Sequence, residues 1–238
     1  MSSIQRIVKM ETSNLCITCI KIGDKFDAEY VNKLYDMVHR QIDVPFFCFT
    51  DNPSGIKEGV TVVEIDVTEY SQWENWWPAW WKINMFVRPE IQDFKRKIFF
   101  DLDVIIHGDI TKILESNSPF ALVYSSWKGL PFQVKNPTKS MFNSSVIAWD
   151  DAKHIYDHWM QDAKGFVAKY AGTDDFYHNE KIKRYRLPPI IYSYRDGCAP
   201  RQENSLEFRP SMGLAILHQH PKNHELDPNI HIIARYWG

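Results

Sequence analysis

The sequence predicts an α/β fold in which helices flank a mixed, mostly parallel sheet. Three observations support this prediction: short apolar runs alternate with helical patterns, the strand candidates are apolar on both faces, and no Gly- or Ser-rich segment divides the chain. Strands that are apolar on both faces are typical of sheets covered by helices. With 238 residues, the chain is expected to form a single domain over residues 1–238.

The first half of the chain supplies most of this pattern. Its predicted strands cover residues 15–20, 44–50, 60–65 and 97–106, and its predicted helices cover residues 28–40 and 78–87. Val31, Leu34, Tyr35 and Val38 recur at helical spacing in the first helix, and Pro78 suits the first turn of the second. This order of elements predicts a sheet whose neighbouring strands run mostly in parallel.

The second half is less regular. Residues 120–126, 144–150, 189–194 and 214–219 are strand candidates, and a polar, proline-containing tail follows them. Residues 151–170 carry one apolar stripe and are expected to form one amphipathic helix. The stripe consists of Ala152, Ile155, Tyr156, Trp159, Ala163, Phe166, Val167 and Tyr170.

Composition and charge exclude several classes of protein. The net charge of -2 gives no basic surplus, so no broad binding of nucleic acid is expected. The N-terminus lacks the continuous apolar region of a signal peptide. No apolar run approaches the length of about eighteen residues that indicates a membrane span, so no integral membrane segment is expected.

The cysteines indicate the redox compartment. Cys16 and Cys19 form a C-x-x-C pattern, which can indicate zinc binding or redox chemistry. They lie in a predicted strand, however, where residues three apart point to opposite faces and cannot share a metal. We therefore expect reduced, buried thiols, with Cys48 and Cys198 as the other two cysteines, and a cytoplasmic protein.

Two carboxylates follow the most apolar strand candidate. Asp101 and Asp103 come directly after Ile98, Phe99 and Phe100. On a continuing strand, residues i and i+2 share a face, and ligands of open α/β sheets bind at the carboxyl ends of strands. Two neighbouring carboxylates repel each other unless a cation or a proton lies between them, and Mg²⁺ or Mn²⁺ takes such oxygen ligands. The alternative is a solvated turn, against which the apolar residues 102 and 104–106 argue.

Several segments together resemble a known enzyme family. They are "AEYVNKLYDMV", "CFTDNPSGI", "WWKINMF", "FFDLDVIIHGDI", "NSSVIAWD" and "ILHQHPKNHE", in that order over nearly the whole chain. In this respect the chain is similar to glycosyltransferases of the GT-A (Rossmann-like) fold with a D-x-D motif, and most similar to small relatives of glycosyltransferase family 8. The resemblance implies transfer of a sugar from a nucleotide-diphosphate sugar, a UDP-sugar by the family's habit, to an acceptor hydroxyl with retention.

The resemblance also implies a metal and donor site. Asp101 and Asp103 would hold Mn²⁺ or Mg²⁺ against the donor diphosphate, with Asp103 also a catalytic residue. His218 fits the third metal ligand best, but the family's glycine after this histidine is Gln219 here, and His220 is a second candidate. Lys222 is placed at the diphosphate or, alternatively, in solvent, and Asp51 of "CFTDNPSGI" is placed in the donor site.

Three further residues are implied as catalytic candidates. Asn143 matches the asparagine that the family places at the donor sugar, although it could simply open a strand. Asp174 and Asp175 correspond to a segment that usually reads Asp-Gln near the transferred sugar. The glutamine is absent here, the alignment can slide by one residue, and two acidic residues could instead cap a helix.

The tryptophan-rich segment is predicted to form a buried helix that carries one lysine. Residues 73–86 hold five of the nine tryptophans, and the helix 78–87 is apolar all round, which predicts burial. Lys82 is its one cation and needs an anionic partner, either a carboxylate near the D-x-D or the donor diphosphate, which the resemblance favours. Trp73, Trp76 and Trp77 precede the helix and are equal candidates to line a sugar or base site.

Two other functions compete with this interpretation. A haloacid-dehalogenase-type phosphatase also has a D-x-D after an apolar strand, but near its N-terminus and followed by a Gly-Thr-like pair where Val104 and Ile105 stand here. A non-catalytic protein of the same fold could bind nucleotide sugars or glycans. For the enzyme, the acceptor is expected to be a glycan or a lipid-linked glycan, the latter reached peripherally at a membrane.

Overall fold

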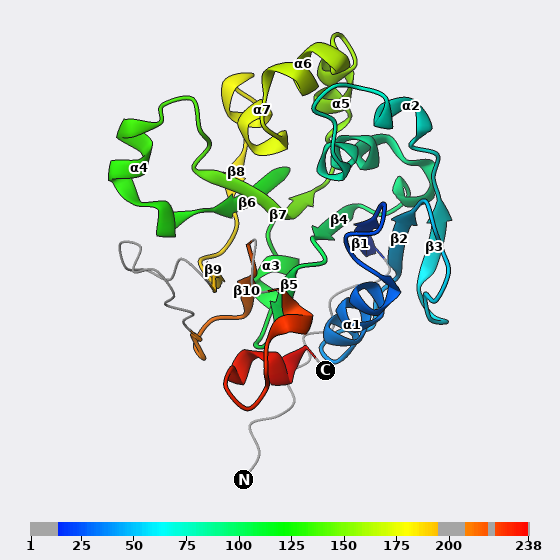
Figure 1. The fold of residues 1–238 in the computed structure, drawn as a ribbon, viewed down its shortest axis with the longest axis vertical. Helices are drawn as coiled ribbons and strands as arrows, with labels where there is room; N and C mark the ends of the chain where they lie inside the picture. The colour runs from blue at the N-terminus through cyan, green and yellow to red at the C-terminus, as the bar shows by residue number, and fades with distance from the viewer. Residues whose placement is uncertain (1–13, 195–207, 219–221, 238) are drawn as a thin grey trace.

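The computed structural model describes residues 14–194, 208–218 and 222–237, and the predicted α/β class is confirmed. A seven-stranded sheet in the order β3-β2-β1-β4-β7-β6-β8 forms the centre (Figure 1). Strands β1 to β4 run in parallel, whereas β7 lies antiparallel between β4 and β6. The strands are β1 (Leu15–Lys21), β2 (Phe46–Thr50), β3 (Thr61–Glu64), β4 (Arg96–Phe100), β6 (Phe120–Tyr124), β7 (Phe142–Trp149) and β8 (Tyr185–Arg186).

Both faces of this sheet are covered, as strands apolar on both sides require. One face packs against α1 (Ala28–His39) and α3 (Thr111–Leu114). The other packs against η2 (Pro78–Val87), α5 (Lys153–Trp159), α6 (Ala163–Lys169) and α7 (Thr173–Asn179). Cys16 and Cys19 belong to different faces, which confirms that they cannot form one metal site. The remaining helices of Figure 1 are α2 (Thr68–Ser71) and α4 (Gly129–Lys135).

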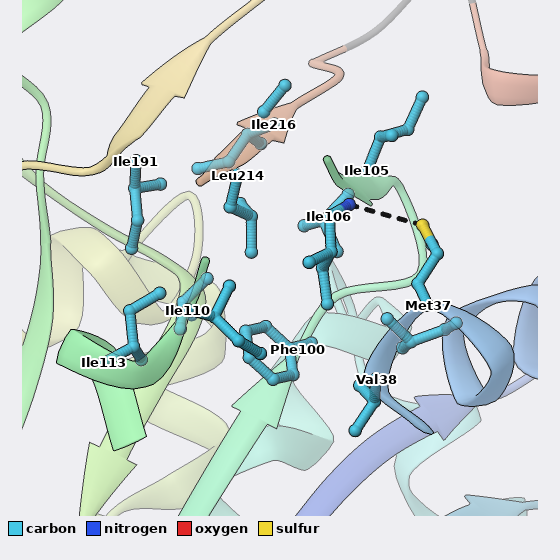
Figure 2. Close-up of a cluster of buried hydrophobic side chains, with 14 of the residues drawn as sticks. Met37, Val38, Phe100, Ile105, Ile106, Ile110, Ile113, Ile191, Leu214 and Ile216 are labelled. Atoms are coloured by element: carbon cyan, nitrogen blue, oxygen red, sulfur yellow. Dashed lines mark hydrogen bonds between the residues drawn. The ribbon is translucent and has the colours of Figure 1, made fainter. Parts of the chain in front are cut away.

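A second, three-stranded sheet corrects the prediction of one strand over residues 97–106. β4 ends at Phe100, and β5 (Val104–Ile106) pairs instead with β10 (Leu214–Ile216), which also pairs with β9 (Ile191–Ser193). Figure 2 shows Leu214 pointing toward Phe100 and Ile106 lying beside the α1 residues Met37 and Val38, all in one buried cluster with Ile216. The Ile106 amide also faces the Met37 sulfur at 3.3 Å. The chain therefore leaves the large sheet at residues 101–103, where the two aspartates lie.

The predicted buried helix 78–87 is confirmed, in 3₁₀ rather than α form. Seven of its ten residues are buried, including Trp80, Trp81 and Lys82. A 3₁₀ helix of this length has poor hydrogen-bond geometry of its own. Packing against α5 and α7 on one side and the sheet on the other therefore holds it in place.

The single helix predicted over residues 151–170 is wrong, because α5 and α6 are separated by a turn at residues 160–162. The Asp162 carboxylate accepts a hydrogen bond from the Gly165 amide at 3.2 Å and so starts α6 anew. The apolar stripe is nevertheless buried on both helices, since Ile155, Trp159 and Val167 are all fully buried.

The C-terminal tail is not merely polar. It forms η5 (Asn223–Glu225) and η6 (Ile232–Tyr236), and it buries Ile233 and Trp237 in the core beside α1. None of the helices in the described ranges has both the length and the apolar character needed to cross a bilayer.

Candidate functional site

The two predicted aspartates lie in a turn between β4 and β5, at the carboxyl edge of the large sheet. Asp101 and Asp103 are therefore not on a continuing strand, as the shared-face argument assumed. The turn is fixed at both ends: the Asp101 amide donates to Ser145 O, and the Leu217 amide donates to Asp103 O, each at 2.8 Å. Leu102 between them is buried, and their side chains are only 26% and 17% exposed. The two aspartates do lie in a turn, as the alternative held, but the turn is mostly buried rather than solvated.

Lys82 reaches this turn from η2. Its ammonium lies 2.7 Å from an Asp101 carboxylate oxygen and donates to the Ser144 carbonyl at 3.1 Å. The residue is only 4% exposed, and a lysine is rarely buried unless it is paired. Of the two partners that the sequence left open, the structure shows the carboxylate.

Lys222 reaches the turn from the other end of the chain. Its ammonium lies 3.1 Å from Asp103 Oδ2, although 119 residues separate the two in sequence. Lys222 is buried, so the alternative of a solvated surface lysine is wrong. The side chain is held at its base as well, because the Lys222 amide donates to the Glu225 carboxylate.

Burial and the neighbouring Asp101 raise the pKa of Asp103, whereas Lys222 and His218 lower it. The His218 ring lies 5.8 Å from that of Trp127, and among the residues that the structure describes His218 does not gather with Asp101 and Asp103 into a group of metal ligands. Two lysines and two carboxylates form a compact cluster of alternating charge. We call Lys82, Asp101, Asp103 and Lys222 the charge quartet.

The quartet offers two oxygen ligands to a cation. Both carboxylates are partly exposed, and oxygen ligands are those that Mg²⁺ and Mn²⁺ prefer, so Asp101 and Asp103 fit a hard divalent ion whose other ligands come from elsewhere. Within the described part of the chain, no three His, Cys, Asp or Glu side chains gather closely enough to hold a metal. His220, the second candidate for a third ligand, lies outside the described residues.

The neighbouring Asp174 and Asp175 have different surroundings. Asp174 Oδ1 accepts from the Ser144 amide at 2.8 Å, so it joins Lys82 at the same residue of β7. Burial raises the pKa of Asp174, against the lowering effect of Ser144 and Lys82. Asp175 instead accepts from the Ser140 amide and pairs with Lys139 at 2.8 Å. Its contacts tie α7 to the chain before β7 and not to the quartet.

The other two candidates shape the backbone, Asn143 next to Ser144 and Asp51 at the loop after β1, and within the described residues no hydrogen bond or ion pair joins Asp51 to the quartet. Asn143 adjoins Ser144 at the start of β7, and its side-chain oxygen accepts from the Ser145 amide at 2.9 Å. Asp51 follows β2, and its carboxylate accepts from the Gly23 amide at 3.0 Å. Gly23 adopts a left-handed φ of 67°, which favours glycine at this turn after β1. Asp51 therefore orders the loop at the carboxyl ends of β1 and β2.

Sequence reasoning missed Ser144. This residue links the site, because its carbonyl accepts from Lys82, its amide donates to Asp174 and its hydroxyl lies 3.1 Å from that of Thr173. A serine inside an apolar strand gives no sequence signal for this role. Only the antiparallel pairing of β7 with β4 brings it to Asp101.

The fold has a match among solved structures. The glycosyltransferase GlyE of Streptococcus pneumoniae TIGR4 matches with a TM-score of 0.55 at 10% sequence identity, over 87% of this chain and 56% of that one. The chain thus spans little more than half the length of that protein. No protein-family model and no curated protein matches the sequence. The mixed, mainly parallel sheet flanked by helices is therefore a glycosyltransferase-like fold.

Proposed function

We propose that this protein is a glycosyltransferase that moves a sugar from a nucleotide-diphosphate sugar, a UDP-sugar first of all, to an acceptor hydroxyl with retention. The charge quartet is the observation that carries this proposal. It lies at the carboxyl edge of the parallel strands, where open α/β sheets bind their ligands, and the fold is that of a glycosyltransferase.

The quartet suits a diphosphate bound together with a cation. A diphosphate placed against two carboxylates alone would be repelled, so a positive charge must lie between them. Asp101 and Asp103 would hold Mn²⁺ or Mg²⁺, which when bound neutralises charge on the leaving diphosphate. Lys82 and Lys222 border the same carboxylates and would add hydrogen bonds to the phosphate oxygens, with Lys82 oriented by the Ser144 carbonyl.

Asp174 and Asn143 would face the donor sugar. Asn143 lies at the start of β7 next to Ser144, Asp174 in the first turn of α7 accepts from the Ser144 amide, and both are partly exposed. A carboxylate beside Lys82 can accept hydrogen bonds from sugar hydroxyls and so orient the ring over the diphosphate. We propose a glycan or a lipid-linked glycan as the acceptor, the latter reached at a membrane surface.

Calorimetric titration of UDP and GDP, with and without Mn²⁺, tests the donor site. We expect UDP binding that requires Mn²⁺ and weakens about tenfold or more in Asp103→Asn, because the variant keeps the side-chain shape but removes the charge that holds the cation. A tenfold loss equals about 1.4 kcal/mol. Asp157→Asn is the matched control, since Asp157 is an exposed carboxylate paired with Lys153 on α5.

Binding of neither nucleotide in the presence of Mn²⁺ would contradict the donor assignment. Binding that ignores both the metal and Asp103→Asn would contradict the site. A protein that binds UDP in this way but never hydrolyses or transfers a UDP-sugar would be the non-catalytic binding protein of the same fold.

A further inference from the structure

Trp77 differs from every other tryptophan of the chain, because its indole is open to solvent. It is 44% exposed, whereas Trp80 and Trp81 are buried. Trp73 and Trp76 are partly buried and pack against the core, where the Trp73 ring lies 5.1 Å from Tyr70 and 6.3 Å from Trp159. Four of the five tryptophans in residues 73–81 therefore serve packing.

The exposed ring is nevertheless held in one place. The Trp77 indole N–H donates to the Ala171 carbonyl at 3.1 Å. The edge of the ring lies so close to Gly172 that a Cβ there would stand 3.0 Å from Trp77 Cζ2. In the chain, Pro78 follows Trp77 directly and begins η2, which fixes the backbone at this point. The indole is thus fixed by its polar edge, while much of its surface remains open.

Two elements connect Trp77 to the candidate site. Gly172 precedes α7, whose Thr173 and Asp174 contact Ser144. Trp77 precedes η2, which carries Lys82 to Asp101. Lys82 follows Trp77 by five residues. At the 3₁₀ rise of about 2 Å per residue, their backbone positions lie about 10 Å apart along η2.

A fixed, exposed indole is suited to bind a ligand with both apolar and polar surface. Aromatic rings supply large apolar faces at interfaces where one end of the side chain stays polar. A sugar ring has such a surface, with C–H groups on its faces and hydroxyls at its rim. A capping role alone would need only the contacts to Ala171 and Gly172 and gives no reason for the 44% of Trp77 that stays exposed.

We infer that Trp77 is the platform on which a sugar ring of the acceptor glycan packs. The inference rests on the proposed glycosyl transfer, and it selects one tryptophan from three that the sequence left equal. The acceptor sugar lies against the indole, and its chain continues toward the first turn of α7 and the quartet.

Saturation-transfer NMR with the full chain tests the platform, using maltose, cellobiose and lactose as probes. We expect saturation transfer to at least one of them in the wild type, and affinity about tenfold weaker in Trp77→Ala. Trp77→Phe should keep most of the binding, since it retains an aromatic face. Gly172→Ala should weaken binding with Trp77 still present, because the new methyl group displaces the ring. Tyr185→Ala removes another exposed aromatic, on β8, and is the matched control.

Two results would overturn the inference: sugar binding in Trp77→Ala equal to the wild type, or no saturation transfer from the wild-type protein to any of the three sugars. UDP titration of the same samples distinguishes failure of the Trp77 platform from failure of the proposed donor site. If the protein binds UDP but Trp77→Ala does not change sugar binding, the platform alone is overturned. Sugar binding that depends on Trp77 without any nucleotide binding would support the platform and contradict the donor assignment.

Discussion

At the scale of single residues, the charge quartet depends on the pairing of buried lysines. Lys82 has a carboxylate and a carbonyl as partners, and Lys222 has a carboxylate. An ammonium removed from water is tolerated only with such partners, and removing one partner leaves the other charge uncompensated. The two members of each pair therefore act as a unit.

Lys82→Met tests this coupling. Loss of a buried partner destabilises a protein by about 3–5 kcal/mol, and the partial exposure of Asp101 reduces the value expected here to about 2 kcal/mol. Asp101→Asn alone should also destabilise the protein, and the double variant should lose less than the sum, as denaturant titration measures in a double-mutant cycle. Lys153→Met, which breaks an exposed pair, should change stability by less than about 0.5 kcal/mol. Additive losses of Lys82→Met and Asp101→Asn would contradict the coupling.

Sequence reasoning reached most members of the site at this scale but not their partners. It selected Lys82, Asp101, Asp103 and Lys222 as donor-site residues, and the structure brings all four together. It could not assign the pairs, because which lysine meets which aspartate depends on strands distant in sequence. Ser144 was missed, because backbone atoms that every residue type possesses make its main contacts with Lys82 and Asp174, and its hydroxyl meets Thr173 only in the folded chain.

At the scale of elements, the predictions succeeded where a single pattern of apolar residues corresponded to a single helix or strand. β1, α1, β2 and β3 lie within a few residues of the predicted ranges. The two failures have different causes, the first distant in sequence and the second local. The strand 97–106 changes sheets at the aspartates because β10 pairs with β5, and the helix 151–170 stops because Asp162 caps a new helix. An apolar pattern runs through both breaks and conceals them.

Asp162→Ala tests whether the Asp162 cap starts α6 as a separate helix. It removes the side chain that accepts from the Gly165 amide at the start of α6, and loss of such a cap costs about 1 kcal/mol. Asp162→Asn should retain most of the stability, because asparagine caps almost as well. The free energy of unfolding from urea titration is the measurement. Equal stability of Asp162→Ala and the wild type would show that the turn is set by packing of Trp159 and Val167 instead.

At the scale of the whole molecule, the site joins segments from most of the chain. The β4–β5 turn receives Lys82 from η2, Ser144 from β7 and Lys222 from the C-terminal segment. The small sheet makes this possible, since β10 carries the chain back beside β5 just before Lys222. Docking of the C-terminal part onto the middle of the chain is thus a condition for the site.

The pH dependence of stability that His107 causes is a measure of that docking. It follows β5, and its ring lies 5.7 Å from Tyr192, 5.0 Å from Phe208 and 5.8 Å from Tyr236, all from the C-terminal part. Burial lowers the pKa of His107 from 6.5 to about 4. The unfolded chain therefore takes up a proton below pH 6.5 while the folded protein does not, so stability falls as the pH falls from 6.5 to 4.

The His107→Phe variant should remove this loss. Between pH 7 and about pH 4.5, the wild type should lose about 2 kcal/mol more of its free energy of unfolding than the variant does. Urea titration at the two pH values measures the difference, and His154→Gln, which changes an exposed histidine of α5, is the matched control. Equal losses in the wild type and His107→Phe would mean that His107 is protonated in the folded protein as readily as in the unfolded chain. The aromatic rings of the C-terminal part would then not exclude water from it, and the docking that brings Lys222 to Asp103 would be looser than the contacts around His107 indicate.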